Sequence, residues 1–331
     1  MKKHGYLAIG MALALVALIV WRYTADSAET VVVKLTPGPT QPRVPPGEAG
    51  IDPAALEQAV VYAGERNTRA LVVGRGGHIV FEKYWDHTTF DTAVKFNGFT
   101  PVLAAIGVGT ALNDHLIVNL DAPVSNYLQN TTAPKTLREA LAQEGADGDA
   151  GRNVNLVARV LEKVTGQKYD AIVAERLWKP LEGGEFSLLR AGSAETGRVF
   201  ADCCMRARLG DWMRIGELLA NDGVFAGNQL TPPHYVTLML TPTHKDSPHG
   251  FFTRVDGAFA ARNVAWLESA GKQRMWIVPS LKLVILRVGD EPAEDRGWDE
   301  AMIPDSIIRG TSGWQSAKVG EGVDPNNYAP H

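Results

Sequence analysis

The sequence predicts an α+β fold in which helices pack on an antiparallel β-sheet. Three observations support this class: strand patterns open the body of the chain, helical patterns fill its middle, and strand patterns return near its end. This order suggests a sheet whose first and last strands are neighbours, with a helical sub-domain inserted between them. We find no internal repeats.

The composition excludes several classes of protein. The chain has 331 residues, of which 45% are hydrophobic and 21% charged, which is enough for one large core or two closely packed sub-domains. Its formal net charge is −4 and it has no basic stripe, so we expect no nucleic-acid partner. No spaced Cys/His set for a structural zinc site is present, and we expect neither a metal nor a cofactor.

Residues 1–28 are predicted to be a cytoplasmic tip and a signal-anchor helix. Lys2 and Lys3 precede an uncharged run from Gly5 to Trp21. As a helix with a rise of 1.5 Å per residue, this run is about 25 Å long, which is the short end of what spans a bilayer. The lysines would keep the N-terminus in the cytoplasm. We therefore expect a single-pass protein of the inner membrane, with its body outside the cytoplasm, in the periplasm if the cell is Gram-negative.

Two other interpretations of this terminus fit less well. A cleaved signal peptide needs small residues before its cleavage site, but Arg22 and Tyr23 follow the apolar run, and cleavage after Ala28 would put Asp26 at the −3 position. A buried core helix is disfavoured at a chain end flanked by lysines. No cysteine follows the run, which excludes a lipoprotein anchor.

The remaining elements follow in order. Residues 36–49 hold five prolines, so residues 29–50 are predicted to be an extended, semi-rigid spacer before a folded body at 51–331. The body opens with a helix that has Asp52 as N-cap and Pro53 at its first position. A strand, a glycine turn and a second strand follow in "RALVVGRGGHIVFEKYW", and "QRMWIVPSLKLVILRVG" is a second hairpin near the end. Helices are expected at about 98–114, 136–143, 153–165, 168–177 and 211–221.

Four blocks of this sequence, taken together, resemble the serine β-lactamase-like family of class C β-lactamases, penicillin-binding DD-peptidases, esterases and nylon-oligomer hydrolases. The blocks are "NLDAPVSNYL", "NLVARVLEKVTGQKYDAIVAERLWKPL", "LGDWMRIGELLANDGVFAGNQLTPPHYVTLMLTP" and "QRMWIVPSLKLVILRVGD". They occur in the order that the family has, over roughly residues 51–310. The resemblance implies a β-lactamase/transpeptidase-like fold and, in an active member, acyl transfer to a serine.

The first motif of that chemistry, a serine followed by a lysine one helical turn later, is missing. The aligned pair falls on one of three register alternatives, Asn97/Thr100, Gly98/Pro101 or Phe99/Val102. None of these pairs offers a nucleophile with a base. Thr92 and Lys95 form a Thr-x-x-Lys, but they lie about two turns too early.

The other two motifs are also degenerate. The tyrosine-containing motif falls on Asp149, Ala150 and Gly151. The Lys/His-x-Gly triplet falls on Ala270-Gly271-Lys272 or one residue earlier on Ser269-Ala270-Gly271, without the imidazole or ammonium group that the family has there. Asn97, Gly98, Thr100, Pro101, Asp149, Gly151, Ala270 and Gly271 are therefore expected to line a degenerate cleft, and we expect no catalytic residue among them.

The adjacent Cys203 and Cys204 leave three interpretations open: two small buried side chains, a vicinal disulfide, or a catalytic cysteine. The segment from His244 to His249 lacks regular ligand spacing, so metal binding there is not expected. His78 follows a glycine turn and is expected to be solvated.

The leading hypothesis is a membrane-anchored, catalytically inactive member of this fold that binds a peptidoglycan or peptide fragment, or a protein of a membrane complex. The alternative is a serine- or cysteine-dependent hydrolase whose nucleophile is displaced, with Cys203 as one candidate. A third hypothesis is a structural subunit that acts mainly through its Gly5–Trp21 helix.

Overall fold

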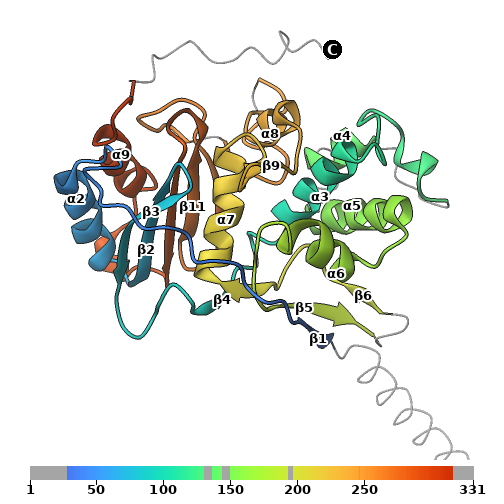
Figure 1. The fold of residues 1–331 in the computed structure, drawn as a ribbon, viewed down its shortest axis with the longest axis horizontal. Coiled ribbons are helices and arrows are strands. Elements are labelled where there is room, and N and C mark those ends of the chain that lie inside the picture. Colours follow the sequence, from blue (N-terminus) through green and yellow to red (C-terminus); the bar gives the residue numbers. More distant parts are fainter. Residues whose placement is uncertain are drawn as a thin grey trace, which may run out of the picture.

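The computed structural model describes residues 28–129, 136–143, 150–192, 197–245, 247–255 and 257–315. Figure 1 shows two sheets with helices around them. The predicted anchor helix lies outside the described residues. Within them, no helix is both long enough and apolar enough to cross a bilayer.

The larger sheet is antiparallel and has the strand order β10-β11-β12-β2-β3. Its strands are β2 (Thr68–Arg75), β3 (His78–Tyr84), β10 (Ala265–Ser269), β11 (Gln273–Val278) and β12 (Leu283–Gly289). β12 pairs with β2 along its length, from Leu283 opposite Arg75 onward. The prediction that the last strands lie beside the first is therefore confirmed.

Helices cover both faces of this sheet (Figure 1). α2 (Pro53–Gly64) and α9 (Met302–Arg309) pack together on one face, and α7 (Leu209–Ala220) packs on the other. α2 begins as predicted, because the Asp52 carboxylate accepts a hydrogen bond of 2.9 Å from the Ala54 N–H and Pro53 occupies the first turn.

A helical lobe lies beside the sheet. Its helices are α3 (Val102–Asn113), α4 (Leu137–Leu141), α5 (Ala150–Thr165), α6 (Tyr169–Ile172), the π-helical turn η2 (Val173–Trp178) and α8 (Pro233–Met239). α3 is buried along all of residues 102–111, so it forms the centre of the lobe. It starts four residues later than predicted, with Pro101 at its N-cap. Three short 3₁₀ turns, η1 (Val124–Asn126), η3 (Pro279–Leu281) and η4 (Glu294–Arg296), and the hairpin of β8 (Val224–Phe225) and β9 (Asn228–Gln229) complete the described elements.

A second, smaller sheet was not predicted. Its strands are β1 (Ala28–Val33), β4 (Ala93–Lys95), β5 (Phe186–Ala191), β6 (Arg198–Val199) and β7 (Arg206–Arg208). Their order is β1-β5-β7-β4, and β6 pairs with β5. This sheet joins the start of the described chain to the segments that flank the helical lobe.

Between residues 34 and 45 the proline-rich segment has neither helix nor turn, but residues 46–50 form turns, and the segment lies on the body and does not span a gap. Residues 28–33 form β1, and the Gly38 N–H donates to the Glu182 carbonyl at 2.9 Å. Arg214 donates to the Pro39 carbonyl at 2.6 Å, and the Ile79 N–H donates to the Pro42 carbonyl at 2.9 Å. Proline lacks an N–H, but its carbonyl still accepts hydrogen bonds, so a proline-rich segment can be fixed to a folded surface.

Glu217 on α7 also holds this segment, since Gln41 donates to its carboxylate at 2.5 Å. Burial raises the pKa of the Glu217 carboxyl above its usual value, although the hydrogen bond from Gln41 opposes the shift. The native state therefore binds the proton more readily than the unfolded state, and this group's contribution to stability falls as the pH rises through the folded pKa.

We expect Glu217→Gln to raise the melting temperature near pH 7 by about 1–2 °C, because the buried charge is removed while an acceptor for Gln41 remains. Near pH 3, which is below the ordinary pKa of a glutamate, Glu217 is protonated in both states and the difference should vanish. Melting curves at the two pH values measure this, and Glu57→Gln on the exposed side of α2 is the matched control. A variant that melts lower than wild type near pH 7 would contradict the expectation.

Candidate functional site

A cavity of about 360 Å³ lies where the start of α3, the helical lobe and β10 meet. It is the candidate site because the sequence placed the degenerate cleft at the same helix start. Its lining residues are Gly98, Pro101, Gln143, Gly151, Val154, Asp202, His249, Phe252, Thr253, Arg254, Trp266, Leu267 and Glu268.

Three of the predicted cleft residues line this cavity: Gly98, Pro101 and Gly151. Asn97 is exposed and does not line it. Thr100 is fully buried, donates its hydroxyl to the Phe96 carbonyl at 2.9 Å and accepts from the Met205 N–H at 3.2 Å. Asp149 lies outside the described residues.

The structure does not bring Ala270 and Gly271 to the cavity. They belong to the turn between β10 and β11, where Gly271 has a φ of 73° and Lys272 a φ of 52°. The Gly271 N–H donates to Glu291 at 3.2 Å. The β10 residues that contact the segment before α3 are Glu268 and Ser269, and Ser269 belongs to the earlier of the two predicted registers.

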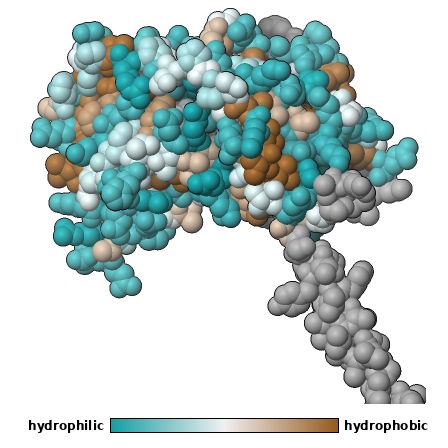
Figure 2. Space-filling model, turned by 60° about the horizontal axis from the view of Figure 1, so that its bottom comes forward, coloured by the Kyte–Doolittle hydropathy of each residue, from teal (hydrophilic) through white to brown (hydrophobic). Residues whose placement is uncertain are grey.

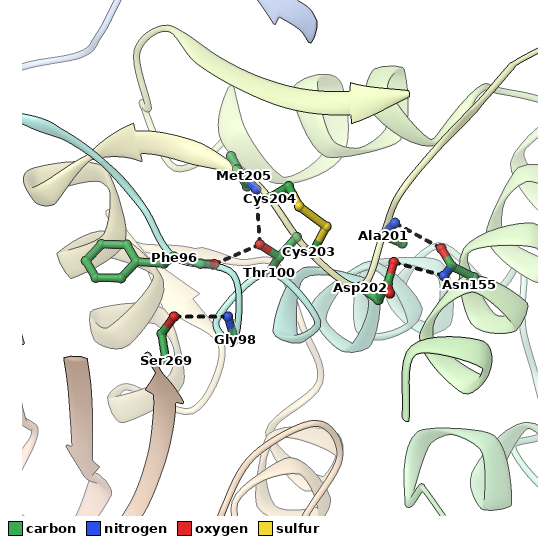
Figure 3. Close-up of a disulfide and its surroundings, with 10 residues drawn as sticks. All are labelled: Phe96, Gly98, Thr100, Asn155, Ala201, Asp202, Cys203, Cys204, Met205 and Ser269. Atoms are coloured by element: carbon green, nitrogen blue, oxygen red, sulfur yellow. Dashed lines mark hydrogen bonds between the residues drawn. A yellow bond between two sulfur atoms is a disulfide. The ribbon is translucent and has the colours of Figure 1, made fainter. Parts of the chain in front are cut away.

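Gly98 sets how closely α3 approaches β10. A Cβ atom at this position would lie 1.9 Å from the Glu268 carbonyl oxygen, so only glycine fits. The Gly98 N–H donates to the Ser269 hydroxyl at 3.3 Å (Figure 3). The turn that leads into α3 is therefore in direct contact with the end of β10.

Phe99 and Val102, one of the three register alternatives, are both fully buried. The Phe99 ring stacks on Phe96 at 4.4 Å between ring centroids and meets Trp212 edge-on at 5.7 Å. These positions carry packing residues that form part of the main core.

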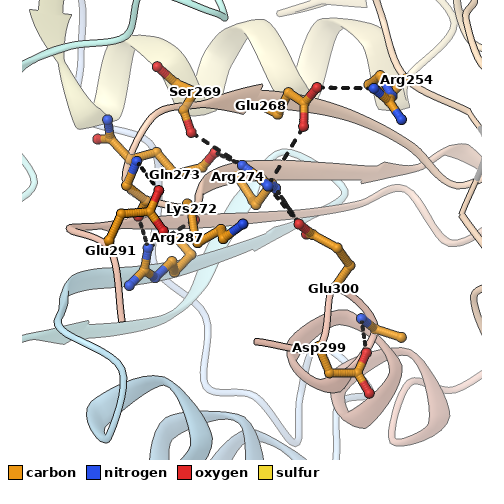
Figure 4. A network of polar contacts seen from close by, with 12 residues as sticks. Arg254, Glu268, Ser269, Lys272, Gln273, Arg274, Arg287, Glu291, Asp299 and Glu300 are labelled. Carbon is orange, nitrogen blue, oxygen red and sulfur yellow. Dashed lines mark hydrogen bonds and ion pairs between the residues drawn. The ribbon is translucent and has the colours of Figure 1, made fainter. Parts of the chain in front are cut away.

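Charged side chains surround one end of the cavity. Arg254 pairs with Glu268 at 3.2 Å, and Arg274 lies 3.7 Å from Glu268 and 2.6 Å from Glu300 (Figure 4). Nothing in the sequence pattern pointed to Arg254 or Glu268, because neither belongs to a motif.

Asp202 is the other carboxylate of the lining. It accepts a hydrogen bond of 2.9 Å from the Asn155 side chain, whose oxygen accepts from the Ala201 N–H at 3.0 Å (Figure 3). The structure shows no cation paired with Asp202 among the residues that it describes. With Arg254 paired to Glu268, the described lining has an excess of negative charge.

Cys203 and Cys204, which follow Asp202, form a vicinal disulfide (Figure 3). Cys204 has a φ of 78°, in the region that L-residues rarely adopt. The next residue, Met205, is tied to Thr100 at the start of α3. A bonded sulfur has no thiol to ionise, so neither cysteine is a nucleophile in this state.

The histidines of the sequence analysis lie apart from any metal-like cluster. His249 lines the cavity, and the exposed His78 ring lies 3.0 Å from the Gly76 carbonyl. Across the described parts of the chain, no group of three or more His, Cys, Asp or Glu side chains is placed to hold a metal ion.

Comparisons with known proteins show what this architecture resembles. No protein-family model matches the chain. The 6-aminohexanoate-dimer hydrolase of Paenarthrobacter ureafaciens is 24% identical over 184 residues, which cover 50% of this chain and 46% of that enzyme. The match therefore spans less than half the length of that relative.

Solved structures match over more of the chain. A structure named as a 6-aminohexanoate-dimer hydrolase from Bacillus anthracis has a TM-score of 0.64 at 14% identity, and covers 88% of this chain and 92% of its own. A β-lactamase from Mycobacterium bovis has a TM-score of 0.59 at 13% identity, over 76% of this chain and 99% of its own. The fold is that of the serine β-lactamase and penicillin-binding-protein family.

Whether the cavity could support the acyl transfer of serine enzymes with this fold depends on the side chains that line it. Among the described lining residues there is no serine, cysteine or lysine. The one hydroxyl group there, on Thr253, is 3% exposed and donates to the Met239 carbonyl. The described walls therefore offer carboxylates, a guanidinium, an imidazole and aromatic rings, which suit binding.

Proposed function

We propose that this chain is a membrane-anchored, extracytoplasmic protein of β-lactamase-like fold that binds a ligand without an acyl-enzyme step. The observation that supports it best is the burial of Phe99 and Val102 at one of the three registers for the family's serine and lysine. An acyl-enzyme mechanism needs a hydroxyl group with a base beside it, and apolar side chains provide neither. The predicted Gly5–Trp21 helix would hold the body at the membrane.

The ligand we propose is a peptide fragment with a free amino group, as in peptidoglycan stems. Asp202 is a carboxylate without a cation partner among the described residues. An ammonium group of the ligand would form a charge-assisted hydrogen bond with it. Trp266, Phe252 and Leu267 offer apolar surface to the rest of such a ligand.

We expect Asp202→Asn to weaken binding of a short synthetic peptide with a free N-terminus by roughly ten-fold or more, because a charge-assisted hydrogen bond is lost. Isothermal titration calorimetry of the full chain measures the affinity. Acetylating the peptide should weaken binding to wild type by a similar factor, with little further loss in the variant.

Asp222→Asn is the matched control, since this exposed aspartate lies in the turn after α7, outside the lining. It should bind as wild type does. Equal affinity of wild type and Asp202→Asn for the free peptide would overturn the proposed role of Asp202.

Absence of catalysis is tested separately. The full chain is incubated with a fluorophosphonate probe and with fluorescent penicillin, and is assayed with a p-nitrophenyl ester. We expect no covalent labelling and no turnover above buffer. Stoichiometric labelling of any serine would refute the non-catalytic proposal.

The alternative remains a hydrolase with a displaced nucleophile, as the relatives are named as hydrolases. The observation that favours it is Ser269, whose hydroxyl contacts the Gly98 N–H beside the cavity. If labelling or ester hydrolysis is found, Ser269→Ala should abolish it. If that variant keeps its activity, Cys203 is the next candidate nucleophile, and its disulfide with Cys204 must first be reduced.

A further inference from the structure

The small sheet has an inner and an outer face, and the pairing register of its strands shows which residues lie on each face. Val32 lies opposite Ser187, Ser187 opposite Arg206, and Arg206 opposite Lys95. Residues directly opposite one another share a face, so these four side chains form one row across β1, β5, β7 and β4.

The two faces differ in exposure. The inner face is buried or half-buried except at Glu29, and includes Phe186, Leu188 and Ala207. On the outer face, Val32 is 51% exposed and Ala191 is also exposed. By register and alternation, the outer face of the strands consists of Ala28, Thr30, Val32, Ser187, Leu189, Ala191, Arg198, Arg206, Arg208, Ala93 and Lys95.

This outer face is basic in a chain whose net charge is negative. Lys95 and Arg206 lie directly opposite each other and both are exposed, and like charges in such a pair repel. Neither has an ion-pair partner among the described residues. Arg198 and, just after β1, Lys34 add exposed basic groups.

Among the residues that the structure describes, few acidic groups offset this charge. Asp91, before β4, pairs with Arg208 at 3.4 Å, and Arg208 also pairs with Asp211. Glu185 precedes β5, and Glu29 lies opposite Arg190, on the other face. Lys95 and Arg206 are therefore unpaired among the described residues, and an anionic partner from outside the described chain would neutralise their charges.

The short stretch of chain between this face and the predicted anchor indicates that the anionic partner is the membrane. β1 begins at Ala28, and only residues 22–27 separate it from the predicted span. Six extended residues reach at most about 20 Å. Because residues 34–50 are packed on the body, they add no reach. If the anchor spans the bilayer, the β1 end of the body must lie beside the membrane.

Figure 1 places β1, β4, β5 and β6 along the lower edge of the molecule. Figure 2 brings that edge forward and shows hydrophilic residues with smaller apolar areas between them. Basic side chains around exposed apolar ones, such as Val32, suit the headgroup region of a bilayer, where the apolar groups enter the boundary and the cations meet phosphates.

We propose that the outer face of the small sheet docks on the anionic phospholipid headgroups of the membrane that holds the anchor. The proposal rests on the proposed membrane anchoring. It fixes the orientation of the body: the small sheet faces the lipid, and the chain from Ala28 is held close to the bilayer surface.

The test uses the full chain with a nitroxide label on Val32→Cys, attached without reductant so that the native disulfide stays closed. The protein is reconstituted in a phosphatidylcholine bilayer and in one that also contains phosphatidylglycerol. We expect the label to be shielded from a water-soluble relaxation agent and accessible to a lipid-soluble one when phosphatidylglycerol is present.

The charge variant is Lys95→Gln with Arg206→Gln. One basic residue near an anionic surface is worth about a five-fold change in the docking equilibrium, so the pair should shift it roughly thirty-fold toward the undocked state. Added salt should act in the same direction. Lys83→Gln with Lys163→Gln removes the same charge from exposed positions elsewhere and should leave the label shielded.

Two outcomes of the labelling experiment refute the docking. A label that stays open to water in both bilayers would show no contact, and shielding that is insensitive to lipid charge and to the variant would indicate a protein partner or a second copy. Retention after an alkaline wash reports the anchor separately. If the chain is washed off, co-sedimentation with phosphatidylglycerol vesicles decides: binding that needs Lys95 and Arg206 supports docking, and no binding overturns it.

Discussion

Phe99→Ala is expected to lower the free energy of unfolding by about 3–5 kcal/mol. The Phe99 side chain is fully buried between Phe96 and Trp212, and Trp212 in turn meets Trp178 edge-on at 5.9 Å. Removal of the ring leaves a cavity in a cluster of aromatic side chains that cannot all move to fill it, and the loss of ring–ring contacts adds to the loss of buried area.

Denaturant unfolding followed by tryptophan fluorescence and by circular dichroism measures this change. Phe99→Leu is the matched variant, since it keeps an apolar side chain of similar reach, and it should lose about 1.5 kcal/mol or less. If Phe99→Ala unfolds within about 1 kcal/mol of wild type, the side chain is not part of the core. A side chain at position 99 could then reach the cavity, and the burial of Phe99 would no longer support the absence of an acyl-enzyme step.

The packing around Phe99 would also disfavour mutations that restore a serine and a lysine at positions 99 and 102. A serine at position 99 would place a hydroxyl group where the structure provides aromatic neighbours, and Val102, the paired position, is equally buried. A lysine there would bury an ammonium group without a carboxylate. In this register, a return to the reactive pair would need several neighbouring changes at once.

Four strands of the main sheet, β2, β3, β11 and β12, and its helices α2 and α7 could be predicted because their sequence signals are local, whereas β10 and α9 were not predicted. β2 and β3 each contain a short apolar run, on either side of a Gly76-Gly77 turn, and α2 carries its own N-cap at Asp52. The small sheet could not be predicted in this way. Two of its strands, β4 and β7, have three residues each, too few to show a period.

Residues 29–50 show a different limit. Proline content predicts an extended backbone, but it predicts neither the turns at residues 46–50 nor what lies beside the segment. The groups that hold this segment, Arg214 and Glu217, are more than a hundred residues away in the sequence. The same limit applies to the cavity: Gly98 and Gly151 were found by motif position, whereas Asp202, Arg254 and Glu268 meet there only through the fold.

Arg287 on β12 provides the second large effect. It is fully buried, and its guanidinium donates to the Thr68 hydroxyl at 3.0 Å and to four backbone carbonyls. These carbonyls belong to Arg66, Gly271, Lys272 and Asp290. Burial lowers the pKa of this guanidinium to about 10, and it stays charged at neutral pH.

We expect Arg287→Met to lower the free energy of unfolding by about 3–5 kcal/mol, although methionine fills much of the same volume. Each carbonyl that loses its donor is a buried or half-buried acceptor without a partner, and the β10–β11 turn loses its attachment to the start of β2. Arg287→Lys should lose about 1–3 kcal/mol, because an ammonium group keeps the charge but cannot reach five acceptors at once.

Arg309→Met on the exposed side of α9 is the control for loss of an arginine and should change stability by less than about 1 kcal/mol. Hydrogen exchange adds a local measurement: amides of residues 66–68 and 271–273 should exchange faster in Arg287→Met than those of α5. Equal stability of Arg287→Met and wild type would mean that water replaces the guanidinium at every carbonyl. The turn that carries Gly271 would then be held by β10–β11 pairing alone, and its fixed position away from the cavity would need another explanation.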